Sequence, residues 1–309
     1  MIRVAQTCLA LLALSLLPAA APAPVIIDLT DDFTRVYAAT KTLPPAEQVA
    51  RFKAEVAARF PAFYSAARRN KTDAEYDAII ARAFARHAAI EESFAARSAA
   101  VAGQLADAQA DFARAFPDMT AMPPIYLVHS LGEMDGGTRD LGGKTVLIFG
   151  ADVIARVHAT DANERPFFEH ELFHVYHTPV LAQCQQVWCA LWEEGLATYV
   201  SAVRNPGAKP AELLLPEADM KMVEANRTAA VCAVRQRATS TADADYNALF
   251  VGGSTLPGLP ERAGYFVGFQ VAEQLGKTAT IQQMAAWPEA MAREKVLATL
   301  TEMAPDCPH

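Results

Sequence analysis

Residues 163–178 read NERPFFEHELFHVYHT, and the interpretation of the whole chain starts from this stretch. Asn163 is a residue type that caps the start of helices, and Pro166 stands where the first helical turn would be. Pro179 follows directly and is typical of the residues just beyond a helix end. The pattern predicts a helix from about residue 164 to residue 177.

This predicted helix carries the pattern H-E-x-x-H. Its two histidines, His170 and His174, are four residues apart, so they lie one above the other on one face and can bind one zinc ion. Glu171 lies beside them, where it can accept a proton from zinc-bound water. A third ligand is expected at Glu194, within the amphipathic helical stretch ALWEEGLATYV of residues 190–200. Two histidines and one glutamate leave a coordination position open for water, as catalytic zinc sites do.

The two stretches together resemble the gluzincin metallopeptidases, the group that includes thermolysin and the neutral zinc aminopeptidases. The aminopeptidase sequence W-L-N-E-G-F-A-S-Y is close to LWEEGLATY at residues 191–199. The resemblance implies that Thr198 steadies the first histidine of the site. It also implies the following roles: His170 and His174 as histidine ligands, Glu194 as the third ligand and Glu171 as the general base.

A second resemblance, near the C-terminus, is to small predicted secreted zinc proteases, which share a helix start of the form Gly-Tyr-x-x-Gly. Residues 264–268 read GYFVG. The chain departs from the neutral aminopeptidases in two ways. Their G-A-M-E-N stretch, which binds a free amino terminus, has only GEMDG at residues 132–136 as a counterpart, and their large flanking domains are missing. The resemblance therefore favours an endopeptidase over an exopeptidase.

Zinc proteases usually supply a histidine or tyrosine that supports the oxyanion of the tetrahedral intermediate. Beyond Glu194 the only histidine is His309, and the tyrosines are Tyr199, Tyr246 and Tyr265. Tyr199 lies about 140° around the helix from Glu194 and is expected to face away from the metal. We predict that Tyr265 supports the oxyanion. The alternative is an ordinary core tyrosine at the start of an apolar helix.

Other polar residues near the motifs have simpler interpretations. His177 is predicted to support the site from outside the ligand set or to pack in the core, because a straight helix places it too far along the axis for a tetrahedral site. Glu193 points away from Glu194 and is predicted to be solvated. Three residues are predicted to be loop or surface residues: His129, Asp152 and His158.

The predicted fold class is α+β, a mostly helical zincin-like domain with a small β-sheet before the zinc-binding helix. The chain divides into an N-terminal helical region, residues 24–121, and a metallopeptidase core, residues 122–309. Short β-branched and aromatic runs at 125–128 and 145–149 predict a β-hairpin or a pair of edge strands around a glycine-rich connection. The strand at 145–149 is predicted to hold an extended peptide by edge pairing.

The first residues predict a secretory signal peptide, residues 1–23. Arg3 gives a positive start, residues 4–17 are apolar, and the small residues after Pro18 suit a signal peptidase. An uncleaved membrane anchor is the alternative, but the apolar run is shorter than the ~20 residues that a bilayer requires. The mature protein is therefore expected to be secreted or periplasmic, with no transmembrane segment.

Four cysteines would remain in the mature chain, and an even number in an exported protein predicts disulfides. Three connectivities are possible. One joins Cys184 to Cys189 and leaves Cys232 to hold the C-terminal tail through Cys307. A zinc site made of all four cysteines would need close C-x-x-C pairs, which the sequence lacks.

Composition narrows the class of function. The chain has 309 residues, 52% of them hydrophobic, which predicts a folded globular protein with a large core. Its net charge of −8 argues against a nucleic-acid partner. We therefore predict a secreted zinc metallopeptidase with one Zn²⁺ per chain, acting on a peptide or protein substrate. The alternatives are a non-catalytic, zinc-stabilised periplasmic binding or scaffold protein, and a helical protein with a chance motif. Cleavage specificity and oligomeric state stay open.

Overall fold

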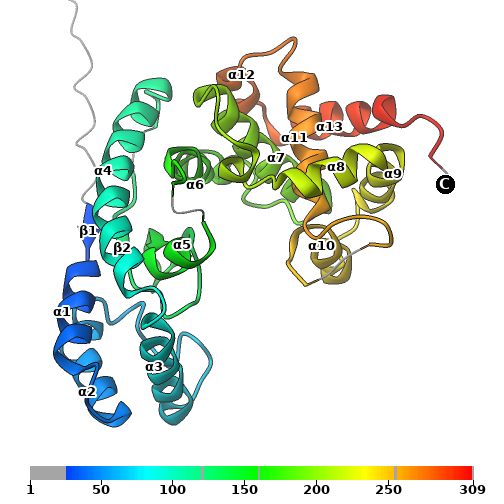
Figure 1. The fold of residues 1–309 in the computed structure, drawn as a ribbon. Coiled ribbons are helices and arrows are strands. Elements are labelled where there is room, and N and C mark those ends of the chain that lie inside the picture. The colour runs from blue at the N-terminus through cyan, green and yellow to red at the C-terminus, as the bar shows by residue number, and fades with distance from the viewer. Residues whose placement is uncertain (1–25, 120–121, 159–160, 254–255, 308–309) are drawn as a thin grey trace, which may run out of the picture.

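The structure is a computed structural model, and it describes residues 26–119, 122–158, 161–253 and 256–307 (Figure 1). Helices dominate, and a small four-stranded sheet precedes the helix that carries the histidine motif. The predicted α+β, mostly helical fold is confirmed. The predicted signal peptide, residues 1–23, lies outside the described residues.

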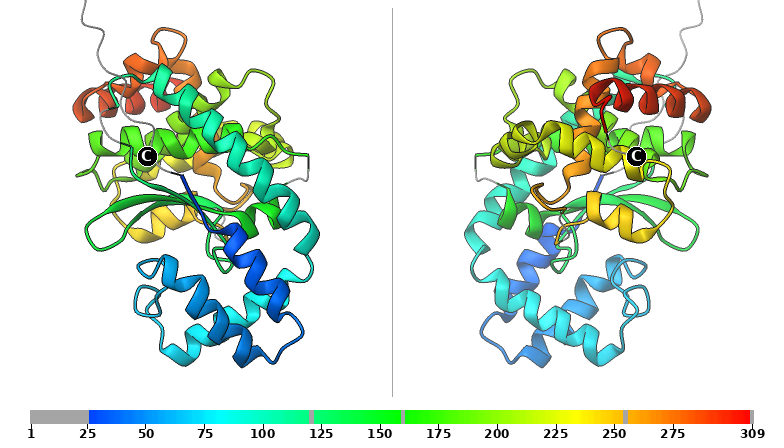
Figure 2. Two further views of the ribbon diagram at one scale, coloured as in Figure 1. Left: turned by 90° about the vertical axis from the view of Figure 1, so that its left-hand side faces the viewer. Right: turned by 90° about the vertical axis from the view of Figure 1, so that its right-hand side faces the viewer.

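Residues 26–119 are mostly helical. It contains a short strand and four α-helices, with a short 3-10 helix after the second: β1 (Ile26–Asp28), α1 (Thr30–Thr40), α2 (Pro45–Glu55), η1 (Ala57–Arg59), α3 (Asp73–His87) and α4 (Glu91–Ala115). α3 begins at a capping box, in which Thr72 and Glu75 each accept a hydrogen bond from the other's backbone N–H. Figure 2 shows α1–α3, in blue to cyan, at the opposite end of the molecule from the red C-terminal helix.

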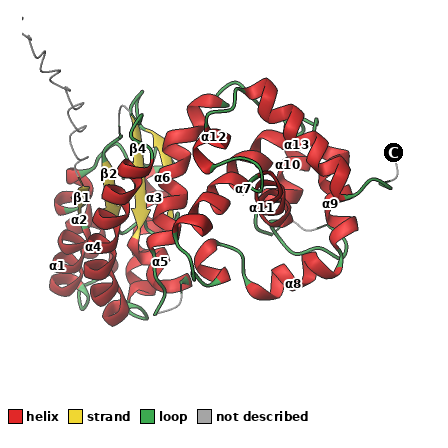
Figure 3. Cartoon of the chain, turned by 90° about the horizontal axis from the view of Figure 1, so that it is seen from above, coloured by secondary structure: helices red, strands yellow, loops and turns green. Residues whose placement is uncertain are grey.

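The sheet has the strand order β1-β2-β4-β3 and continues with β2 (Ile125–Val128), β3 (Gly136–Asp140) and β4 (Thr145–Gly150). β1, β2 and β4 are parallel, whereas β3 is antiparallel to β4. Both faces are covered: Tyr126 stacks on Phe60, which directly follows η1, and Phe149 packs against Phe168 of α6 (Arg165–His177). Seen from above, the strands lie between the N-terminal helices and α6 (Figure 3).

The sheet differs from the sequence prediction in two respects. The runs at 125–128 and 145–149 do not form a hairpin, because β2 and β4 are parallel neighbours. The hairpin is instead formed by β3 and β4, whose turn contains Gly142 and Gly143 with φ of 67° and 80°. The prediction that the strand at 145–149 lies at an edge is therefore wrong. β4 is paired on both sides, and the glycine-rich segment itself supplies the edge strand β3.

α6 and α7 (Val187–Arg204) carry the two sequence motifs and pack against each other. The carboxylate of Glu169, fully buried in α6, accepts hydrogen bonds from Arg204 Nε at 2.9 Å and from Asn205 Nδ2 at 3.0 Å. Arg165, one turn before Glu169, adds a third donor at 3.2 Å. These charge-assisted bonds tie the start of α6 to the end of α7 and so fix the register between the two helices.

The remaining helices complete the described part of the chain. They are α5 (Ala151–Val157) before α6, and then η2 (Thr178–Val180), η3 (Pro210–Leu213), α8 (Glu217–Ala225), α9 (Arg227–Arg237), α10 (Asp243–Phe250), α11 (Ala263–Leu275), α12 (Ile281–Ala285) and α13 (Glu289–Met303). Among these, α10, α11, α13 and η3 pack against α7, and α11 does so most extensively. No helix in the described ranges has the length and apolar character needed to cross a membrane.

Two disulfides are formed, Cys184–Cys189 and Cys232–Cys307. Of the three connectivities that the sequence left open, the structure has the one with a small loop before α7 and a second bond that ties the C-terminal tail to α9. Cys232 and Cys307 are both buried, so this second bond also belongs to the core.

Candidate metal centre

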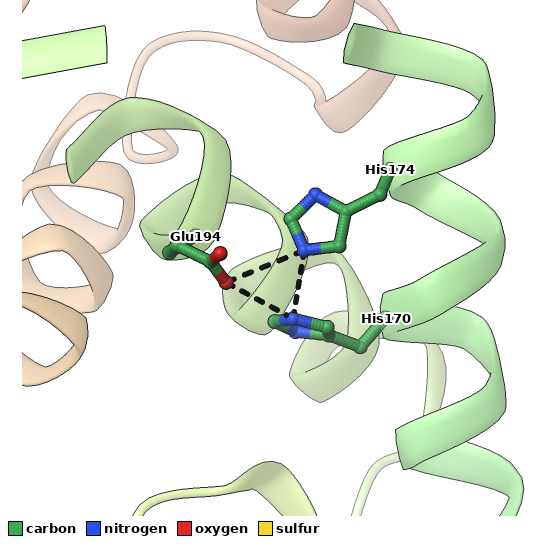
Figure 4. A group of neighbouring side chains, drawn as sticks. All are labelled: His170, His174 and Glu194. Atoms are coloured by element: carbon green, nitrogen blue, oxygen red, sulfur yellow. Dashed lines mark hydrogen bonds and ion pairs between the residues drawn. The ribbon is translucent and has the colours of Figure 1, made fainter. Parts of the chain in front are cut away.

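Three potential metal ligands converge between α6 and α7. The Nε2 atoms of His170 and His174 are 3.0 Å apart, and each is 3.3 Å from Oε2 of Glu194 (Figure 4). Helical spacing stacks the two histidines on one face of α6, and the packing of α7 on α6 presents the glutamate to them. The group is able to hold a metal ion.

The spacing and the chemistry of these donors fit a small divalent metal. A tetrahedral site with metal–ligand distances of about 2.0–2.1 Å places its ligand atoms roughly 3.3 Å from one another. The ligand atoms here are 3.0 to 3.3 Å apart. Oε2 of Glu194 is buried and has no aligned hydrogen-bond donor, which leaves a lone pair aimed between the two imidazoles. A carboxylate in this position needs a cation.

Thr198 contacts His170 at Nδ1, the ring nitrogen that does not face Glu194. Its hydroxyl donates to the backbone carbonyl of Glu194 at 2.8 Å and lies 3.4 Å from Nδ1 of His170. Since that hydroxyl proton is already committed to a carbonyl, Nδ1 of His170 is the donor in the second contact. The tautomer with the proton on Nδ1 leaves the Nε2 lone pair free for a metal.

Glu171 lies next to the ligand group and lines the same cavity. Burial raises the pKa of its carboxyl to about 7. The adjacent His174 acts in the opposite direction and lowers the pKa, which burial nevertheless dominates. Glu171 is therefore a carboxylate that faces the space in front of the ligands and is only weakly solvated.

A cavity of about 460 Å³ opens in front of the three ligands. One wall is the edge strand β3, a second is formed by α6 and α7, and the start of α11 closes a third side. The side chains that contribute polar or charged groups are Asp135, Thr138, Arg139, His170, Glu171, His174, Thr178, Glu193, Glu194, Tyr246, Arg262 and Tyr265.

Of the three candidate tyrosines, Tyr265 is placed beside the ligands. Its ring is 9% exposed and lines the cavity, and burial together with the Glu194 carboxylate raises the pKa of its hydroxyl well above 10. Tyr246 also lines the cavity, but its side chain is half exposed on α10. Tyr199 packs against Phe269 and does not line the cavity.

Three cavity residues were missed or misjudged from the sequence. Glu193, predicted to be solvated, is half-buried in the cavity wall and bonds to Thr178, and burial raises its pKa. Asp135 was noted only as part of the GEMDG stretch at 132–136, without a role of its own, and Arg262 was not singled out. Both reach the cavity from loops next to β3 and α11, so no periodic pattern marked them.

The remaining histidines do not join the ligand group. His177 is fully buried and stacks on Phe173, and neither ring nitrogen makes a hydrogen bond. It therefore packs in the core, which is one of the two roles predicted for it. His129 lies in the loop that follows β2, as one of its two predicted placements, but it is not at the surface, because its ring stacks on Phe33 in the core. His158 is mostly buried against Glu164.

Asp152 is also buried rather than exposed. Its carboxylate accepts hydrogen bonds from the backbone N–H groups of Ser130 and Gly132, at 2.6 and 2.7 Å. These two bonds shape the loop that leads from β2 to the edge strand β3. Asp152 is therefore a structural residue of that loop and lies outside the cavity wall.

No family model, no curated protein and no solved structure matches this chain. The geometry of the site is therefore the basis for assigning a function.

Proposed function

We propose that this protein is a zinc-dependent metallopeptidase. The observation that carries the proposal is the convergence of His170, His174 and Glu194, with Glu171 beside them and a cavity in front of them. Two imidazoles and one carboxylate form a set that leaves one zinc position open, whereas structural zinc sites use four protein ligands. When bound, zinc supplies Lewis acidity for a water molecule and for the scissile carbonyl.

Glu171 is the general base of the proposed reaction. It accepts a proton from the attacking water and passes it to the leaving amine when the peptide bond breaks. Tyr265 is the donor that supports the developing oxyanion, because its hydroxyl stays protonated and faces the same cavity. Thr198 keeps the first histidine in the required tautomer.

The edge strand β3 is the element that binds the substrate backbone in this proposal. Gly136, Gly137, Thr138 and Arg139 line the cavity, and β3 pairs with β4 on one side only. An extended peptide can add to its other side by main-chain hydrogen bonds. A Cβ atom on Gly136 would lie 2.6 Å from the Phe167 ring, so glycine lets this strand approach the start of α6 closely.

The two disulfides fit an extracellular location, where such bonds persist. We propose a secreted or periplasmic protein that is released by cleavage of the signal peptide at residues 1–23. Its partner is a peptide or protein substrate.

The test measures bound zinc and the cleavage of a quenched peptide library by the mature protein and by two variants. Glu171→Gln removes the general base, and Glu302→Gln makes the same chemical change at an exposed position on α13. We expect one zinc in all three proteins, and cleavage by the parent and by Glu302→Gln only. Full activity of Glu171→Gln would refute the mechanism. Bound zinc without cleavage by the parent would support a scaffold protein, and absence of zinc would exclude a metalloenzyme.

A further inference from the structure

Among the described residues, one positive charge in the wall of the cavity forms no ion pair at contact distance, although the carboxylates of Glu194 and Asp135 act on it from further away. Arg262 directly precedes α11, and its guanidinium carbon lies 4.0 Å from the ring centroid of Tyr265, the residue to which it also hydrogen-bonds. In the part of the chain that the structure describes, no carboxylate oxygen lies within 4.0 Å of this guanidinium. Its charge therefore faces the cavity without an ion pair.

Several other partly buried arginines are paired with carboxylates. Arg68 and Arg69 both bind Glu133, and Arg165 and Arg204 both bind Glu169. Arg139, the other arginine of the cavity wall, donates to the backbone carbonyl of Thr138 at 2.8 Å and lies 4.0 Å from Glu133. Arg262 differs from all of these because it leaves a guanidinium fork available to a ligand.

The backbone holds Arg262 firmly at this place. Its φ of 56° lies in the left-handed region, which residues other than glycine seldom adopt. The carbonyl of Arg262 accepts the N–H of Tyr265 at 2.9 Å and so starts α11. The guanidinium and the positive end of the α11 dipole therefore belong to the same corner of the cavity.

With a divalent metal bound, the charges of the cavity wall nearly cancel, so an anionic ligand can bind there. Four carboxylates line it, those of Asp135, Glu171, Glu193 and Glu194, against the two guanidinium groups. The excess negative charge of the wall would be balanced by the two positive charges of a zinc ion. Glu194 would then be a ligand of that ion. A group that carries a carboxylate can enter this site and meet Arg262 without net repulsion.

We propose that Arg262 is a specificity residue that binds a carboxylate of the peptide substrate. A planar guanidinium recognises a carboxylate through two parallel hydrogen bonds, which a neutral amide cannot replace. The carboxylate comes either from the C-terminus of the peptide or from an Asp or Glu side chain. This inference rests on the proposed function, since it names the substrate class of the same site.

The experiment compares binding of two pools of N-acetylated random hexapeptides, identical except that one ends in a free carboxylate and the other in an amide. The zinc-loaded Glu171→Gln protein, which the proposed mechanism leaves able to bind, is incubated with each pool, and retained peptides are identified by mass spectrometry. The same protein is prepared with Arg262→Gln, with Arg262→Lys, and with Arg293→Gln. The Arg293 variant removes an equal charge at an exposed position on α13, outside the cavity, and serves as the matched control.

We expect retention of the free-acid pool to exceed that of the amide pool by about tenfold or more if the C-terminus is bound. Enrichment of Asp and Glu within the amide pool would instead identify a side-chain carboxylate. Either preference should vanish in Arg262→Gln, persist in part in Arg262→Lys, and persist in full in Arg293→Gln. Zinc content and melting temperature of each variant show that the site is intact.

Equal retention of both pools without acidic enrichment, or a preference that survives Arg262→Gln, overturns the inference. Failure of the proposed function gives a different result. The parent would then cut no peptide although its carboxylate preference depends on Arg262, and the residue would belong to a binding site.

Discussion

Gly195 of α7 and Gly268 of α11 are in direct backbone contact. A Cβ atom on Gly195 would lie 2.2 Å from the carbonyl carbon of Gly268, and a Cβ atom on Gly268 would lie 2.5 Å from the carbonyl oxygen of Leu191. Gly195 follows the ligand Glu194, and Gly268 stands one turn after Tyr265 on α11. The contact of the two glycines therefore holds the tyrosine beside the metal ligands.

This contact predicts that Gly268→Ala damages both stability and the site. Because the nearest atoms are backbone atoms of α7, the added methyl group forces the two helices apart, and overpacking of this kind costs about 1–3 kcal/mol. We expect a lower midpoint in urea and weaker zinc binding. Gly103→Ala is the matched control, since Gly103 is an exposed residue of α4 with no heavy atom near its Cβ position. It should raise stability by about 0.5–1 kcal/mol. A Gly268→Ala protein as stable as the parent would contradict the importance of the contact.

The hydroxyl of Thr198 predicts a difference between two conservative variants. Thr198→Val removes the acceptor for Nδ1 of His170 and leaves this buried group without a partner, whereas Thr198→Ser keeps the hydroxyl. Loss of such a supporting hydrogen bond typically weakens metal affinity by about 10–100-fold. Competition with a zinc chelator measures the affinity of all three proteins. Equal affinities of the valine and serine variants would show that the hydroxyl does not hold the ligand.

The two disulfides should differ in their contribution to stability. Cys232 and Cys307 are 75 positions apart, whereas Cys184 and Cys189 are 5 apart, so the first bond restricts the unfolded chain far more. In the chain-entropy description, replacing both cysteines of the longer loop by serine costs about 2 kcal/mol more than the same change in the shorter loop. Urea unfolding of the two double variants measures this difference. Equal costs would mean that strain or residual structure in the unfolded state outweighs loop length.

We predict that His87 contributes to the loss of folding stability at low pH. Burial, and to a lesser degree the neighbouring His129, lowers its pKa from 6.5 to about 4, while Glu91 and Asp152 act weakly in the opposite direction. Its ring packs among the aromatic side chains of Phe33, Tyr37 and Phe94. Since the folded-state pKa lies below the unfolded value, the unfolded chain binds the proton more tightly. Stability from this group is therefore full above pH 6.5 and is lost as the pH falls toward 4.

The variant His87→Leu tests this prediction. Between pH 7 and pH 4.5 the parent should lose on the order of 2–3 kcal/mol more than the variant, because all other titrating groups remain in both proteins. Chemical unfolding at the two pH values measures the loss. An identical pH dependence in parent and variant would show that His87 is already accessible to protons in the folded state.

Much of the candidate metal site was predictable because it depends on local periodicity. The spacing of His170 and His174 alone places them on one helix face, and α6 begins within one residue of its predicted start. The capping and proline signals that predicted its ends are local as well. Glu194 was found in the same way, from the helical pattern of the stretch around it.

Residues outside periodic elements were not predictable. Arg262 and Asp135 reach the cavity from loops, and Glu193 was misjudged because angular position on one helix does not show which other elements pack around it. The buried positions of His129 and Asp152 depend on α1 and on the β2–β3 loop, which are distant in sequence or irregular. Their partners become known only from the packed structure.

Local sequence patterns were enough to predict the helical character of the chain, the two helices of the candidate metal site, and which side chains share a face, because these follow from the 3.6-residue period and from capping residues. Long-range packing places β3 rather than β4 at the sheet edge, selects which cysteines pair, and brings α7 and α11 into contact at Gly195 and Gly268. These features join segments far apart along the chain, and the free energy that selects them comes from packing, which no local pattern records.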